Sequence, residues 1–300
     1  MNSRTVNRLS ETWLRNTNNL IIPRPESPTD RAYKLGRAAL THVFGVDWRD
    51  ENIFHARTGF LKNVTGANTP HQQETHKMRI ALLAEMIWNL QDMPHFDACA
   101  GQMHDRDKIE STYAELEIAR LIYAKSNATF AFRTPIGIKK EDYDLTVTYD
   151  DGAVVCAETK CKSEETEITL ETIQRSFRKA RDQMPSDKPG IIFVKVPRFW
   201  LHDEQFAFAM ARLATHYFRQ ADKIVSIKYY TASVLYEKEW HGETTTEIIA
   251  YQEHSNPNHR FDAFREKDWR IFPEDPSTAP PPRTSFNGMP SHWRPLFFFG

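Results

Sequence analysis

Apolar residues in the first third of the chain recur at helical spacing. The segments "RAYKLGRAALTHVF" (31–44) and "KMRIALLAEMIWNL" (77–90) place apolar side chains three and four positions apart, as in an amphipathic helix. The stretches between these segments are polar. The pattern predicts a helical N-terminal region over residues 1–104.

From about residue 105 the pattern changes to an alternation of helix and strand. The segments expected to be helices are 106–125, 169–184 and 203–220, and the expected strands lie within 143–162, 190–196, 223–237 and 245–252. Strands that alternate with helices in this way usually join one sheet through right-handed crossovers. The predicted fold class is therefore α/β, with a mixed central sheet flanked by helices over residues 105–272.

The end of the chain differs in composition from both regions. Residues 273–300 are rich in proline and are expected to form an extended C-terminal tail. The last residues, "HWRPLFFFG", are too apolar for a free tail. We expect them to dock back on the core, with binding to a partner as the alternative.

The stretch "YDLTVTYDDGAVVCAETKCK" (143–162) reads as two alternating strands joined by a tight turn. Three loop residues that end in glycine, at 150–152, are typical of a type I turn closed by a left-handed glycine. The resulting register sets Asp144 opposite Glu158. Because side chains alternate along a strand, Lys160 should emerge on the same face as these two carboxylates.

Two opposed carboxylates repel each other unless a cation neutralises them. Oxygen ligands gathered at one point suit a hard divalent ion, above all Mg²⁺, which binds through one or two carboxylates and keeps several waters. Lys160, one pleat further along, could then orient a bound water or hold the charge of a phosphate. The hairpin therefore predicts a metal site with a neighbouring ammonium group.

At these residues the chain resembles the PD-(D/E)XK nuclease superfamily, which has the restriction-endonuclease-like fold. The family pattern is an aspartate at the start of one strand and Glu-x-Lys on the next, here Asp144 and then Glu158-Thr159-Lys160. The family's order of helix, three-stranded meander, helix and strand also fits roughly residues 106–235. Tyr143 stands where the family usually has proline. The motif is short, so its weight comes from the hairpin register and the flanking elements.

The resemblance implies a metal-dependent phosphodiesterase, specifically a DNA endonuclease in a defence or DNA-repair setting. Mg²⁺ would be the cofactor, with Mn²⁺ able to substitute, held by Asp144, Glu158 and the Thr159 carbonyl. Lys160 would position the attacking water, so that the catalytic residues are Asp144, Glu158 and Lys160. Two alternatives stay open: a member of the same fold that binds nucleic acid or protein without cutting, and a structural or adaptor protein.

A further acid on the preceding helix joins this set. On a helical wheel Glu115 falls within the apolar stripe, whereas Glu117 points the other way, in line with Glu110. A carboxylate in an apolar stripe is costly unless something pairs with it. The resemblance implies that a glutamate from this helix reaches the metal, and Glu115 is the better match. The alternative is that Glu115 pairs with an arginine such as Arg133.

The helix after the motif carries a basic polar face. Its cations, together with Lys162, could follow a phosphate backbone, and those on the helix are Arg175, Arg178 and Lys179. The alternative is an ordinary solvated face. Gln174 and Gln183 on the same helix are assigned no role.

Composition limits the partners and the compartment. The formal net charge is −1, so a polyanion must be met by a local basic patch. The three cysteines show no CxxC spacing, which argues against a disulfide framework and fits a reducing compartment. Neither a signal peptide nor a membrane span is expected, so the chain reads as cytoplasmic. The sequence does not decide between a monomer and a homo-oligomer.

Overall fold

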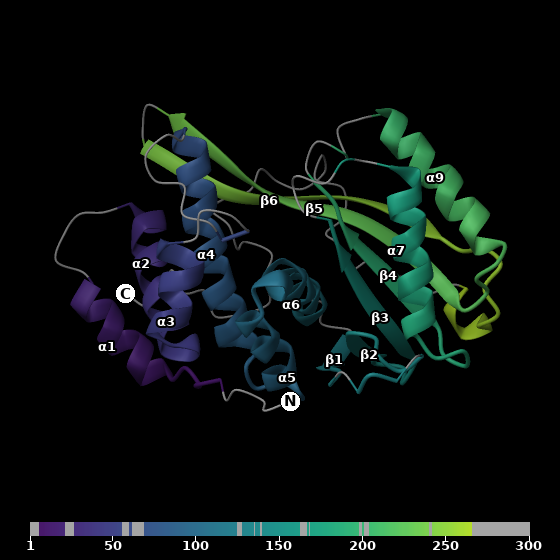
Figure 1. Ribbon diagram of the computed structural model, residues 1–300, viewed down its shortest axis with the longest axis horizontal. Helices are drawn as coiled ribbons and strands as arrows, with labels where there is room; N and C mark the ends of the chain where they lie inside the picture. The colour runs from purple at the N-terminus through teal and green to yellow at the C-terminus, as the bar shows by residue number, and fades with distance from the viewer. Residues whose placement is uncertain are drawn as a thin grey trace.

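Figure 1 shows the computed structural model, which describes residues 6–21, 27–55, 60–61, 69–124, 128–134, 136–138, 140–162, 167, 169–197, 200, 204–239 and 242–265. The helices are α1 (Glu11–Ile21), α2 (Pro28–Phe44), α3 (Val46–Arg49), α4 (Pro70–Leu90), α5 (Phe96–Ala100), α6 (Ile109–Ala124), α7 (Leu170–Gln183) and α9 (Glu204–Phe218). Short π- or 3₁₀-type turns cover Asp50–Phe54, Gly101–His104, Arg106–Lys108 and Asp262–Phe264. The strands are β1 (Ala128–Phe132), β2 (Leu145–Tyr149), β3 (Val154–Cys161), β4 (Gly190–Lys195), β5 (Ile224–Glu239) and β6 (Gly242–Ser255).

The two helices predicted most clearly in the N-terminal region are present, and local capping explains where they begin. The Ser27 hydroxyl accepts a hydrogen bond from the Asp30 N–H at the start of α2. Thr69 and Gln72 form a capping box at the start of α4. A proline follows each capping residue, where its missing N–H costs nothing.

The six strands form one mixed sheet in the order β1-β2-β3-β4-β5-β6. The pairs β1–β2, β2–β3 and β5–β6 are antiparallel, and β3–β4 and β4–β5 are parallel. Helix α7 connects the first parallel pair and α9 connects the second. The α/β class with a mixed sheet flanked by helices is confirmed. The pattern of the sequence had not identified β1 as a strand.

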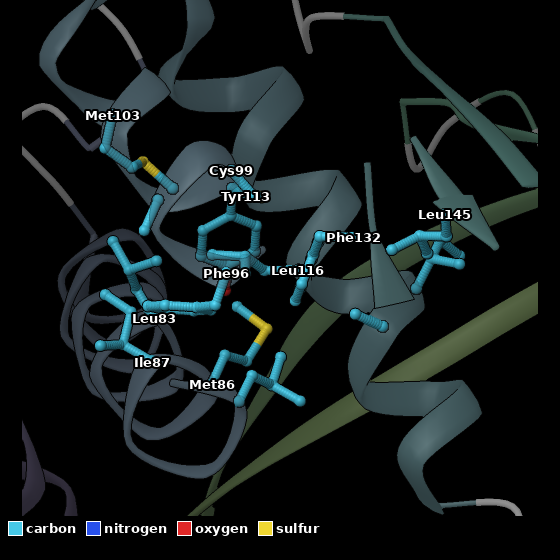
Figure 2. Close-up of a cluster of buried hydrophobic side chains, with 14 of the residues drawn as sticks. Leu83, Met86, Ile87, Phe96, Cys99, Met103, Tyr113, Leu116, Phe132 and Leu145 are labelled. Carbon is cyan, nitrogen blue, oxygen red and sulfur yellow. The ribbon is translucent and has the colours of Figure 1, made fainter. Parts of the chain in front are cut away.

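Helices cover both faces of the sheet. Figure 1 shows α6 between the sheet and α4, with α7 and α9 on the opposite face. The core on the α6 side joins side chains of α4, α5 and α6 to those of β1 and β2, as Figure 2 shows for Leu83, Phe96, Leu116, Phe132 and Leu145. The helical N-terminal region and the sheet therefore share one hydrophobic core.

Strands β5 and β6 continue beyond the rest of the sheet as a two-stranded ribbon that crosses toward α4 (Figure 1). Val234 of β5 packs there on Met78 and Leu82 of α4. The expected docking of the tail at 273–300 lies outside the described residues. No helix among the described residues has the length and apolarity needed to cross a membrane.

Candidate functional site

The β2–β3 hairpin has the register that the sequence predicts. Its pairs run from Thr148 opposite Val154 to Leu145 opposite Ala157. The turn closes at Gly152, whose φ of 81° lies in the left-handed region that glycine adopts at little cost. Because the register is set by this turn, the residues at the far end of the hairpin are placed by local sequence.

Asp144 lies immediately beyond the last pair of β2 and β3. Its backbone N–H donates to the Ala157 carbonyl at 3.1 Å, and its Oδ2 atom accepts from the Thr159 N–H at 2.6 Å. A residue in an extended strand directs its N–H and C=O toward the same neighbour. The Thr159 carbonyl therefore faces the side of the strand on which Asp144 lies.

Glu158 and Lys160 form an ion pair on β3. The Glu158 side chain is 1% exposed, and its Oε1 atom accepts from the Lys160 Nζ. The same ammonium donates to Gln183 Oε1 at 2.6 Å, and Gln183 Nε2 in turn donates to the Asp142 carbonyl at 3.1 Å. Lys160 is thus held between a carboxylate of the sheet and an amide at the end of α7, with one N–H left over.

Glu115 on α6 completes a group of three carboxyls. The Cys99 thiol donates to Glu115 Oε2 at 3.6 Å. Burial, and then the charge of Asp144, raise the pKa of Glu115 well above its usual value. The Arg133 guanidinium, the alternative partner for Glu115, lies over the Tyr143 ring at 5.0 Å.

The other two carboxyls have raised pKa values for the same reason. Burial raises the pKa of Asp144 to about 6, against the opposing effects of Lys160 and of the Thr159 N–H. Burial and the charge of Asp144 raise the pKa of Glu158 well above its usual value. Lys160 lowers the pKa of all three carboxyls, so its ammonium group faces the whole cluster without neutralising it.

These groups fit a hard divalent cation. The Oε2 atom of Glu158 and the Thr159 hydroxyl are buried without a hydrogen-bond partner among the described residues. A buried carboxylate oxygen without a donor is costly, and a cation would remove that cost. The described residues contain no three His, Cys, Asp or Glu side chains arranged as a metal-binding group. Mg²⁺ needs fewer, since it takes one or two carboxylates and completes its shell with water.

Glu117 differs from the expectation of an outward-pointing, inert side chain. It is 2% exposed, and its Oε2 atom pairs with Lys195 Nζ at 2.6 Å and accepts from the Tyr230 hydroxyl at 3.3 Å. The Lys195 ammonium also lies 4.8 Å from the centre of the Tyr113 ring. Glu115 and Glu117 are thus both directed inward, and Glu117 is a structural ion-pair partner.

The cations predicted to bind nucleic acid lie along and beside α7. Arg175, Arg178 and Lys179 are exposed. Lys162 is partly buried, with its Nζ donating to the Thr172 carbonyl at 3.4 Å. Burial lowers the pKa of Lys162, and Lys179, Lys160 and Arg175 lower it further. Three of the four predicted cations, Lys162, Arg175 and Lys179, therefore lie in one region with Lys160, next to the carboxyl cluster. Arg175 also pairs with Glu171 at 3.1 Å.

Gln183 is the site residue to which sequence reasoning assigned no role. Its position in the last turn of the helix after the motif was the available signal. That signal is weak because a glutamine there is usually solvated. The contact depends on how the end of α7 packs beside β3, which only the assembled fold provides.

The pKa shifts predict that the metal-free protein becomes less stable as the pH rises. Glu115, Asp144 and Glu158 retain protons in the folded state that the unfolded chain releases near pH 4. The stability that these neutral carboxyls contribute is complete below that pH. It is lost as the pH rises through their pKa values in the folded state, about 6 for Asp144. The free energy of unfolding should fall by up to about 1.4 kcal/mol per pH unit for each proton released.

Urea unfolding in the presence of EDTA, from about pH 4.5 to about pH 7.5, would measure this slope, because the range spans the unfolded and folded pKa values of these carboxyls. Added Mg²⁺ should restore stability most at the upper end of the range, because it binds the deprotonated carboxylates. A metal-free protein whose stability rises across this window would contradict the prediction.

No family model, curated protein or solved structure matches the chain. The interpretation of the site therefore depends on its own geometry and charges.

Proposed function

We propose that the protein is a metal-dependent phosphodiesterase that cuts DNA internally. The observation that carries this proposal is the arrangement of Asp144, Glu158 and Lys160. Within the described part of the chain, one oxygen of the buried Glu158 carboxylate has no hydrogen-bond partner, a second carboxyl lies beside it, and an ammonium group is held at their edge. A hairpin that served the fold alone would gain nothing from burying these charges together.

The residues that would hold Mg²⁺ are Asp144, Glu158 and the Thr159 carbonyl, and Glu115 would add negative charge beside them. When bound, a divalent ion supplies Lewis-acid stabilisation of the phosphate and activates water. The carboxyls themselves supply the negative charge that selects a hard cation over a neutral ligand. Their raised pKa values are what such a site shows before a cation is present.

Lys160 is the group that would touch the reacting atoms. Two of its three N–H bonds are directed to Glu158 and Gln183. The third can donate to the attacking water or to a phosphate oxygen, where a fixed positive charge stabilises the transition state. Gln183 acts through Lys160 by holding the direction of its ammonium group, and is a positioning residue.

The surroundings of the site support a polyanionic substrate. The cluster made by Lys160, Lys162, Arg175 and Lys179 gives local positive potential to a chain of nearly neutral charge. The order α6, three antiparallel strands, α7 and β4 also agrees with the core order of the PD-(D/E)XK superfamily.

Incubation with labelled DNA tests the proposal. Linear duplex, circular duplex, single-stranded DNA and RNA would be treated with Mg²⁺, Mn²⁺ or EDTA. We expect cleavage of circular DNA with either metal and none with EDTA, since a circle can be opened only by an endonuclease. Binding without cleavage under every condition would support the alternative of a non-cutting member of the fold.

Neutralising the exposed face of α7 should reduce the salt dependence of DNA binding. If Arg175, Arg178 and Lys179 contact phosphates, replacing all three by alanine lowers the number of counterions that binding releases from the DNA. The slope of log affinity against log salt concentration should then flatten by roughly two to three units. Replacing Arg15, Arg31 and Arg49 of the N-terminal helices gives a variant with the same change in charge, and its slope should stay that of the wild type. An unchanged slope in the α7 variant would show an ordinary solvated face.

A further inference from the structure

The loop between β1 and β2, residues 133–144, is closed on itself beside Asp144. The Arg133 N–H donates to the Asp144 carbonyl at 2.9 Å, so the loop leaves and returns at the same place. Compact loops with adjoining ends are a common form of functional surface loop. Both ends of the β1–β2 loop therefore lie next to the carboxyl cluster.

Hydrogen bonds fix the returning half of the β1–β2 loop to the end of α7. The Lys140 N–H donates to the Asp182 carbonyl at 3.0 Å, and the Asp142 N–H donates to the Gln183 carbonyl at 3.2 Å. The Gln183 side chain donates back to the Asp142 carbonyl. Because the same side chain accepts from Lys160, the loop and the ammonium group share one support.

The tip of the loop directs apolar side chains outward. Asp142 Oδ1 accepts from the N–H groups of Ile136 at 2.8 Å and Gly137 at 3.1 Å, and Gly137 adopts a left-handed φ of 71°. These polar contacts are made inside the loop. Ile136 and Ile138, on either side of the glycine, remain 48% and 52% exposed. Two large apolar side chains on one braced turn give a small exposed apolar surface that a partner could cover.

Cations gather where the β1–β2 loop meets the end of α7. The Lys140 N–H donates to the carbonyl of Asp182, the neighbour of Arg181, and the Lys223 Nζ donates to the Met184 carbonyl at 2.7 Å, so these three cations lie around the end of α7. Lys140 is exposed and holds a left-handed φ of 75°, a strained conformation for a side chain other than glycine. The cations beside Lys162 form a second group near the same site. An apolar pair on a loop whose base is flanked by cations is complementary to a nucleic-acid groove lined by phosphates.

We propose that the β1–β2 loop is a wedge for double-stranded DNA. Ile136 and Ile138 enter the minor groove and part a base step near the phosphate to be cut, while Lys140, Arg181 and Lys223 hold flanking phosphates. The inference rests on the proposed nuclease function and extends it to a substrate class, a duplex with a deformable step. Pyrimidine–purine steps such as TA unstack most easily and should be preferred over A-tracts.

The double variant Ile136→Ser/Ile138→Ser tests the wedge. Duplexes that carry 2-aminopurine at a TA step report unstacking through increased fluorescence, and a Glu158→Gln background keeps the DNA intact. We expect fluorescence to rise when the Glu158→Gln protein binds. When the two isoleucine substitutions are made in that same protein, fluorescence should not change. Duplex affinity should fall about tenfold or more through the loss of apolar contact, with single-strand affinity unchanged. Leu20→Ser on α1, where the side chain is 81% exposed, is the matched control and should change none of these readouts.

The outcomes separate the wedge from the nuclease. If the wild type neither binds nor cuts DNA, the proposed function fails and the wedge fails with it. If the wild type cuts DNA but the double variant retains its fluorescence rise and duplex affinity, the wedge is overturned and the nuclease stands. An equal loss of single-strand and duplex affinity would also overturn the wedge, since it would indicate a general contact.

Discussion

Replacing Glu158 by glutamine should reduce Mg²⁺-dependent cleavage at least about a thousandfold while the protein stays folded. Glutamine keeps the shape of the side chain, so the packing around β3 is preserved. It removes the negative charge of a carboxylate whose Oε2 atom has no hydrogen-bond partner among the described residues. Since burial disfavours that charge, the metal-free variant should be as stable as the wild type or more stable.

Three measurements check this prediction: cleavage of circular DNA, Mg²⁺ or Mn²⁺ binding by calorimetry, and urea unfolding. Asp144→Asn should behave like Glu158→Gln in all of them. Lys160→Ala should lose cleavage while retaining metal binding, because a lysine ammonium donates hydrogen bonds and is not a ligand for a cation. Glu171→Gln, at the exposed start of α7, is the control and should be nearly silent. Full cleavage by either acid variant would overturn the assignment of the site.

Replacing Glu117 by glutamine should destabilise the fold by about 3–5 kcal/mol, a larger stability effect than is expected at Glu115. The change leaves the Lys195 ammonium buried without its counter-charge, 2.6 Å from a neutral amide. The neighbouring rings of Phe60 and Tyr113 cannot solvate a cation as water does. The midpoint of urea unfolding reports the loss.

Two further variants distinguish a broken ion pair from damaged packing. Glu117→Leu combined with Lys195→Met removes both charges and should recover most of the lost stability, because apolar residues can replace a buried pair at little cost. Glu115→Gln should leave the metal-free protein equally stable or more stable and should weaken metal binding. If Glu115→Gln unfolds the protein and Glu117→Gln does not, the roles of the two acids are reversed.

The elements that the sequence determined by itself are those whose signals are local. The turn at 150–152 sets the register of β2 and β3 through one left-handed glycine, and hence places Asp144 near Glu158. Thr169 caps α7, and the apolar run 190–196 contains a strand that is buried on both faces. A few neighbouring residues carry enough information for each of these features, because turns, caps and side-chain alternation depend on the adjacent backbone.

The tertiary structure alone decided which residues far apart in the chain meet. A helical wheel assumes one buried face, but α6 packs against α4 on one side and β1 and β3 on another, so Glu115 and Glu117 are both directed inward. Gln183 reaches Lys160 because α7 ends beside β3, and Arg120 on α6 pairs with Glu247 of β6 at 2.8 Å. The value of such contacts depends on burial and on the charge of the partner, and neither quantity is a property of a local segment.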